Sequence, residues 1–235
     1  LYRQQDLFGL RPREIRCHRA FLSQVLQIGL PSGLQRSITS ISNAMVQSYV
    51  NLFGTMVMAG FSAYMKVDVF LGLPMQSLSL AIVTFVGQNM GAGKLERAKK
   101  GVFVTAVLVC VINISCCLFL WLFGREVLGI FSTDQTVLDY GEQILRQLLP
   151  FYFLLGLAQL YAGALRGFGD AVAPMGIMIG CYVVLRQVFL WAATRVFHSV
   201  DIIIWNYPIT WFAAFAVVFL YYKRGKWQTK ESKVK

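Results

Sequence analysis

The chain has 235 residues, of which 57% are hydrophobic and 14% are charged, and its mean hydropathy is +0.58. Soluble domains carry about 25% charged residues, so this composition excludes an ordinary soluble globular protein and favours a chain immersed in a bilayer. The formal net charge of +11 fits either nucleic acid or a membrane surface, and the placement of the charges must decide between them.

The first predicted element is a polar helix from Phe21 to about Phe53, after an arginine-rich segment without a signal peptide. A lipid-facing helix cannot carry so many polar groups, so one face must meet protein or water. Polar side chains recur every four residues and form a stripe, which we expect to line a water-filled cavity; the alternative is hydrogen bonding between helices. The stripe comprises Gln35, Thr39, Asn43 and Gln47, with Arg36 beside it.

The second predicted helix starts near Ala59, after a turn between Gly54 and Gly60, and ends near Gly93. Lys66 and Asp68 are two residues apart, so their side chains point in different directions and pair poorly with one another. Either both extend to the headgroups, or Asp68 meets Arg36 or Arg186 inside the bundle. The latter makes Asp68, with Lys66, a candidate coupling site, and Gln76 is expected to face the cavity.

Four further spans follow, namely Gly101–Gly124, Gln147–Leu165, Ala171–Thr194 and Ile202–Tyr222. The third of these contains one charge, Arg186, which is too costly near mid-membrane to face lipid. It therefore needs a carboxylate, a group of carbonyls or water. Further candidate cavity residues on these spans are Tyr152, Gln159 and Arg186.

Six spans place both termini on one side, and the basic residues test this arrangement. They gather in the two terminal segments, in the loop after the second helix (Lys94, Arg97, Lys99, Lys100) and at Arg166, whereas the opposite loops, around Gly54–Gly60, Arg125–Asp139 and Arg195–Asp201, hold only Arg125 and Arg195. Basic loops face the cytoplasm, so both termini are predicted to be cytoplasmic. The positive charge then reflects topology and anionic lipid, and no nucleic-acid partner is expected.

The stretch VGQNMGAGKLERAKKG, residues 86–101, has the glycines and lysine of a phosphate-binding loop but not their spacing. A P-loop requires Ser or Thr after the lysine, where this chain has Leu95, and it follows a strand rather than an apolar span. We expect a tight turn at Gly87, Gln88, Gly91 and Gly93. In ALRGFGDAVAPM, residues 164–175, Gly167 and Gly169 end a helix, Asp170 caps the next one, and Arg166 lies at the headgroups; the alternative is a hinge or gate.

These two stretches, together with IGLPSGLQ at residues 28–35, resemble motifs of the multidrug and toxic compound extrusion (MATE) transporters. The resemblance implies an all-α membrane protein in which six helices form one lobe, the C-terminal one, of a twelve-helix transporter. Residues 1–20 resemble the cytoplasmic linker between lobes, residues 21–222 the lobe, and residues 223–235 form a basic cytoplasmic tail. The chain is then a fragment, or a half that needs a partner.

The resemblance further implies export of small organic compounds, often cationic or aromatic, across the membrane, with a bacterial cell membrane as the expected location. Antiport with H⁺ or Na⁺ is expected, without another cofactor. Some members bind the coupling cation with a Glu on the first helix and an Asp on the fourth. Thr39 and Leu155 occupy those places here. Neither ionises, so coupling is expected to use the absent N-terminal lobe or Asp68.

Two other functions are considered, a lipid-linked precursor flippase of similar architecture and a six-helix membrane interaction subunit that does not transport. An enzyme is not expected, because His18 and His198 lie outside the spans and no pair of carboxylates accompanies them. The five cysteines show no metal-ligand spacing, and we expect no metal site.

Overall fold

The structure is a computed structural model that describes residues 19–196 and 199–225. Most of the expected linker and of the basic tail lies outside the described residues. The helices are α1 (Arg19–Asn51), α2 (Thr55–Gly91), α3 (Leu95–Gly129), α4 (Gln135–Leu148), the 3₁₀ turn η2 (Leu149–Phe151), α5 (Tyr152–Gly167), α6 (Val172–Ile179), the π-helical segment η3 (Gly180–Leu185), α7 (Arg186–Val196) and α8 (Val200–Lys223).

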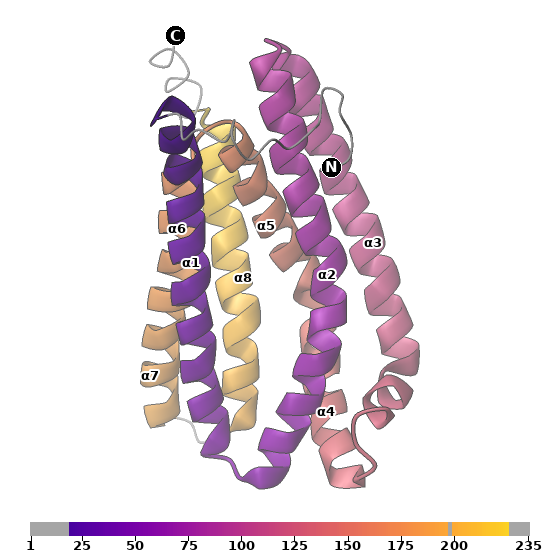
Figure 1. The fold of residues 1–235 in the computed structure, drawn as a ribbon. Helices are drawn as coiled ribbons and strands as arrows, with labels where there is room; N and C mark the ends of the chain where they lie inside the picture. Colours follow the sequence, from indigo (N-terminus) through magenta and orange to yellow (C-terminus); the bar gives the residue numbers. More distant parts are fainter. Residues whose placement is uncertain (1–18, 197–198, 226–235) are drawn as a thin grey trace, which may run out of the picture.

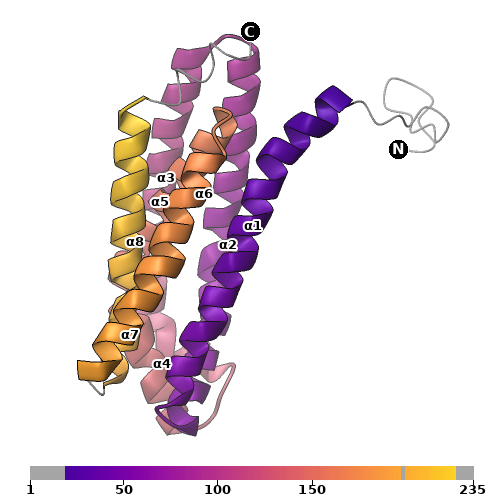
Figure 2. The ribbon, with the colours of Figure 1, turned by 90° about the vertical axis from the view of Figure 1, so that its left-hand side faces the viewer.

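The helices form one bundle in which α5 lies between α2 and α8 (Figures 1 and 2). The start of α1, the α2–α3 and α5–α6 turns, and the end of α8 lie at the same end of the bundle (Figure 1). Because α4, η2 and α5 are continuous, and α6, η3 and α7 likewise, the chain runs along the bundle six times. The all-α fold predicted from the sequence is confirmed.

Five of these segments are long and apolar enough to cross a membrane, namely Thr55–Gly91, Leu95–Gly129, Gln135–Gly167, Val172–Val196 and Val200–Lys223. The helix α1 has 33 residues, ample length to span, but it is not among them because it is too polar. This polarity comes in part from the stripe of polar side chains that was noted in the sequence of this segment.

The connections differ from the sequence prediction in two places. Gly54 has a φ of 96° and makes the α1–α2 turn, whereas Gly60 is inside α2, where an added Cβ would lie 2.7 Å from Tyr140 Cβ. Gly60 therefore lets α2 pack closely on α4 and takes no part in the turn. The expected outer loop from Arg125 to Asp139 is mostly helical, because α3 continues to Gly129 and α4 begins at Gln135.

The two turns at the opposite end share one geometry. Gly93 has a φ of 69° and its amide donates to the Met90 carbonyl, while the Lys94 amide donates to the Asn89 carbonyl. In the other turn the amides of Gly169 and Asp170 donate to the carbonyls three and five residues earlier in the same way, and Gly169 has a φ of 87°. This is the Schellman ending, which requires a left-handed residue and so favours glycine. Gly87, Gln88 and Gly91, which were expected in the turn, lie within α2 instead.

Asp170 stabilises the start of α6. The carboxylate is 2% exposed, accepts a hydrogen bond from the Ala173 amide at 3.3 Å, and accepts another from the Tyr221 hydroxyl at 2.6 Å. Since it caps one helix and ties it to α8, Asp170→Ala is expected to lower the free energy of unfolding by about 2–3 kcal/mol.

Denaturant titration in mixed micelles measures this loss, and Asp134→Ala is the matched control. Asp134 caps α4 through the Thr136 and Val137 amides but is exposed, so its loss is expected to cost only about 1 kcal/mol. Equal effects of the two substitutions would show that the buried bond to Tyr221 contributes nothing.

Candidate functional site

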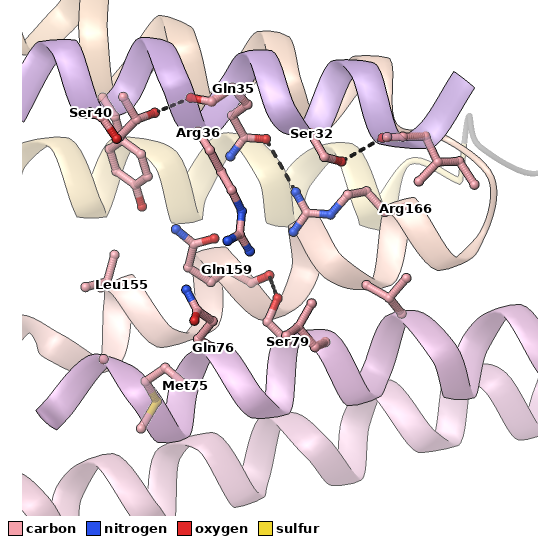
Figure 3. Close-up of a pocket in the computed structure, with 17 residues that line it drawn as sticks. Ser32, Gln35, Arg36, Ser40, Met75, Gln76, Ser79, Leu155, Gln159 and Arg166 are labelled. Atoms are coloured by element: carbon pink, nitrogen blue, oxygen red, sulfur yellow. Dashed lines mark hydrogen bonds between the residues drawn. The ribbon is translucent and has the colours of Figure 1, made fainter. Parts of the chain in front are cut away.

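A cavity of about 600 Å³ lies between α1, α2 and α5 (Figure 3). Pro31 and Pro74 lie within α1 and α2, and Gly29 and Gly72 leave room where larger side chains would fill the space. The polar side chains that line the cavity are Ser32, Gln35, Arg36, Thr39, Ser40, Gln76, Ser79, Gln159, Arg166 and Tyr182. None of the lining residues is acidic.

Three hydroxyl groups of the lining donate to backbone carbonyls. Ser32 donates to the carbonyl of Ile28 and Thr39 to that of Gln35, each at 2.8 Å. Ser79 on α2 donates to the Gln159 carbonyl on α5 at 2.9 Å and thereby links the two helices. These three hydroxyl protons are used by backbone carbonyls, so they are not available to a ligand in the cavity.

The structure places five of the expected cavity residues around this space, namely Gln35, Arg36, Thr39, Gln76 and Gln159. The polar stripe of α1 divides into two parts. Its first two members line the cavity, whereas Asn43 accepts a hydrogen bond from Arg186, and Gln47 donates to Asn51 one turn further along α1 at 3.1 Å.

Arg166 enters the cavity, contrary to the expectation that it lies among the headgroups. Its Nη1 donates to Gln35 Oε1 at 3.4 Å, across 131 residues of sequence. Thr39 and Leu155, the two places that the resemblance assigns to the coupling cation, line the same space. The cavity lining therefore has no carboxylate at these two places or elsewhere.

Arg186 is 3% exposed and lies outside the cavity lining. Its Nη1 donates to Asn43 Oδ1 at 2.7 Å and its Nη2 to Thr210 Oγ1 at 3.3 Å. The guanidinium also lies 4.8 Å from the ring centre of Tyr207 and 5.5 Å from that of Tyr182. Neutral oxygens and aromatic faces thus take the place of the carboxylate that the sequence offered as one partner.

Asp68 binds two tyrosines and neither of the expected arginines. Tyr64 and Tyr152 both donate to Asp68 Oδ1, the first at 3.2 Å, and their own hydroxyl oxygens are 2.6 Å apart. Tyr64 is one turn away on α2, while Tyr152 begins α5, so the contact joins two helices. Tyr152 therefore belongs to this contact and not to the cavity lining in which it was expected. We call Asp68, Tyr64 and Tyr152 the carboxylate–tyrosine cluster.

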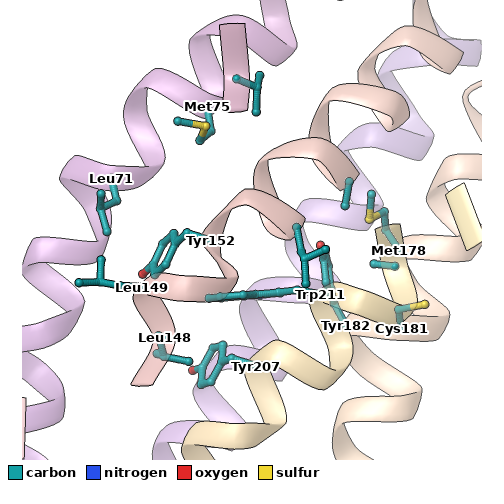
Figure 4. Close-up of a cluster of buried hydrophobic side chains, with 14 of the residues drawn as sticks. Leu71, Met75, Leu148, Leu149, Tyr152, Met178, Cys181, Tyr182, Tyr207 and Trp211 are labelled. Carbon is teal, nitrogen blue, oxygen red and sulfur yellow. The ribbon is translucent and has the colours of Figure 1, made fainter. Parts of the chain in front are cut away.

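Lys66 is separate from this cluster, since its ammonium lies 5.2 Å from the ring centre of Phe131 and its side chain is exposed. The rings of Tyr152, Trp211 and Tyr207 pack against one another (Figure 4). Trp211 contacts the rings of Tyr152 and Tyr207 at 5.0 and 5.8 Å between centroids, and Arg186 lies over Tyr207. The two charges are therefore connected through packed rings and not through an ion pair.

Within residues 19–196 and 199–225, no group of three or more His, Cys, Asp or Glu side chains could hold a metal ion. Sequence reasoning missed Ser79 and Tyr182 as lining residues. Both lie in apolar runs, and only the packing of distant helices places them at the cavity.

A protein-family model described as MatE matches residues 31–192. The chain is 28% identical over 206 residues to a probable multidrug resistance protein, YpnP, of Bacillus subtilis, which covers 87% of this chain and 46% of that protein. It is 26% identical over 192 residues to an FAD transporter of Shewanella oneidensis, covering 82% and 42% of the two chains. The chain thus spans about half the length of these curated relatives.

Solved structures show the same arrangement of helices. A transporter of the MOP superfamily from Pyrococcus furiosus superposes with a TM-score of 0.84 at 18% identity, over 95% of this chain and 50% of that one. An outward-facing multidrug resistance MATE transporter superposes with a TM-score of 0.83 at 18% identity, over 96% and 50%. In each case one half of a longer chain matches nearly all of the present one.

Proposed function

Because the chain belongs to the MatE family, we propose that it forms the C-terminal lobe of a secondary active transporter that exports organic compounds. The observation that carries this proposal is the polar cavity between α1, α2 and α5, inside a bundle of apolar helices. Intramembrane polar groups of this kind are costly and mark substrate or ion pathways in transporters. Transport, rather than catalysis, is therefore the proposed activity.

We further propose that the basic end of the bundle faces the cytoplasm of a bacterial cell, as the positive-inside rule implies. Lys94, Arg97, Lys99 and Lys100 lie in and after the α2–α3 turn, at the end where α1 begins and α8 ends (Figure 1). The second lobe is the expected partner, since the chain spans about half of its relatives.

For coupling, we propose the carboxylate–tyrosine cluster as the site of H⁺ or Na⁺ exchange. Asp68 is the only carboxylate residue on α2 and α5, and Thr39 and Leu155 do not ionise. Hydrogen bonds from two tyrosine hydroxyls stabilise the charged carboxylate of Asp68, whereas a proton bound to that carboxylate would compete with these hydrogen bonds. Lys66 has no part in this site.

Efflux from vesicles containing the complete two-lobed protein tests the proposed function. A transporter of this type is expected to expel fluorescent organic dyes when either a proton or a sodium gradient is imposed, and collapsing the effective gradient should stop the efflux. Empty vesicles provide the control. If the vesicles retain cationic, neutral and anionic dyes under both gradients, drug export is rejected. The two remaining hypotheses are then a lipid-linked precursor flippase and a membrane interaction subunit.

A further inference from the structure

Two arginines point into the cavity between α1, α2 and α5 (Figure 3). Arg36 comes from the middle of α1, and Arg166 from the last turn of α5. In the part of the chain that the structure describes, neither arginine forms an ion pair, and Arg166 donates only to the neutral Gln35 oxygen. The cavity therefore presents two positive charges without a negative one.

This arrangement is unfavourable without a ligand. The charges of Arg36 and Arg166 oppose one another, and partial burial of Arg166 removes part of the water that would screen them. Each guanidinium offers a planar set of N–H donors that matches the two oxygens of a carboxylate or phosphate. An anion between them would remove the repulsion and satisfy these donors.

The remaining polar lining also supplies donors. Gln76 and Gln159 face the cavity with their side-chain amides, and neither amide has a hydrogen-bond partner within the described segments. Tyr182 is 3% exposed, lines the cavity, and its hydroxyl has no hydrogen-bond partner in the structure. A buried donor without a partner is costly, and a ligand oxygen would offset that cost.

Apolar side chains complete the lining, among them Ile28, Met75, Leu80 and Val83. A small inorganic anion would leave this surface unused, whereas the body of an organic compound would cover it. We propose that the cavity binds the carboxylate or phosphate group of an amphipathic organic compound through Arg36 and Arg166. The inference rests on the proposed function for its claim that this compound is cargo, and it assigns an anionic rather than a cationic class.

Equilibrium binding to the complete two-lobed protein in nanodiscs tests this assignment. The probes are carboxyfluorescein, an anionic aromatic dye, and rhodamine 6G, a cationic one, followed by fluorescence polarisation. The variants are R36Q/R166Q, which removes both charges, and R36K/R166K, which retains charge but loses the planar donors. Arg97→Gln is the matched control, because Arg97 is exposed on α3 and does not line the cavity.

We expect R36Q/R166Q to bind carboxyfluorescein about tenfold or more weakly, the lysine variant to show a smaller loss, and Arg97→Gln to bind normally. Rhodamine 6G should bind equally or more tightly to R36Q/R166Q. Carboxyfluorescein binding that is the same in the wild type and R36Q/R166Q would overturn the proposal. So would a wild type that binds only rhodamine, as expected if carboxylates of the second lobe neutralise the arginines.

The anionic group can belong to a soluble compound or to a lipid headgroup, and nanodiscs with and without phosphatidylglycerol separate them. If phosphatidylglycerol weakens carboxyfluorescein binding to the wild type but not to R36Q/R166Q, the anionic group is that of a lipid. If phosphatidylglycerol does not change binding to the wild type, the anionic group belongs to a soluble compound. Should R36Q/R166Q unfold, Arg36→Gln alone serves instead, since Arg36 is exposed and bonds no described side chain. Probe binding requires no gradient, so it is independent of the efflux assay. If the protein binds carboxyfluorescein but fails to expel any dye, the transport proposal is rejected and the anion-binding proposal stands.

Discussion

Asp68→Asn is expected to lower gradient-driven efflux of the complete transporter by about tenfold or more, in the range typical of coupling between two sites. Asparagine keeps the shape of the side chain and can still accept from the tyrosines, but it cannot exchange a proton or balance a cation. Driven efflux should therefore fail, while exchange of labelled for unlabelled substrate without a gradient continues. Comparing the two assays in proteoliposomes separates lost coupling from lost binding.

Lys66→Gln is the matched control for that prediction. Lys66 lies two residues from Asp68 on α2 but is exposed beside Phe131, so efflux should remain near the wild-type rate. Tyr64→Phe and Tyr152→Phe, which each remove one donor to the carboxylate, should give intermediate rates. If gradient-driven efflux by Asp68→Asn stays within about twofold of the wild-type rate, Asp68 is not the coupling residue and the coupling site belongs to the other lobe.

The helices could be predicted from the sequence because each long run without charge is a local property. The amphipathic α4 was missed for the same reason: it has charges, so a search for apolar runs passes over it. Its buried residues nevertheless recur with helical spacing, at Val137, Leu138, Gly141, Ile144, Leu145 and Leu148. A search for this period would have placed a helix where an outer loop was expected.

The partners of the charged residues could not be predicted, because they come from distant parts of the chain. Asp68 meets Tyr152 across 84 residues, and Arg186 meets Asn43 across 143. The sequence showed only that a membrane charge needs a partner. It also favoured carboxylates and arginines as partners of one another, whereas the fold supplies tyrosine hydroxyls to the acid and an amide, a hydroxyl and aromatic rings to the base.

Arg166 shows a further limit of local reasoning. Its place in the last turn of α5, before Gly167, is typical of a headgroup anchor. The direction of its side chain depends on α1, which crosses nearby and presents Gln35. Since Gln35 was already expected in the cavity, the structure extends that polar region by one arginine that the sequence assigned elsewhere.

The contact between α2 and α5 depends on glycines whose role the sequence did not reveal. An added Cβ at Gly163 would lie 2.8 Å from both the Ser79 carbonyl oxygen and its Oγ, and 3.2 Å from Ile82 Cγ2. Small residues allow membrane helices to approach in this way. Backbone atoms cannot move aside as a flexible side chain can, so even a methyl group must separate the helices.

Gly163→Ala is therefore expected to lower the free energy of unfolding by about 1–3 kcal/mol, despite alanine's better helix propensity. The same shift would disturb the Ser79–Gln159 hydrogen bond and the cavity wall, so carboxyfluorescein binding should weaken too. Gly176→Ala is the matched control, because an added Cβ there meets nothing within 4 Å and should leave stability unchanged or slightly higher. Denaturant titration of both variants in mixed micelles decides the matter: if they prove equally stable, α2 and α5 have room to separate, and the cavity wall between them is not rigid.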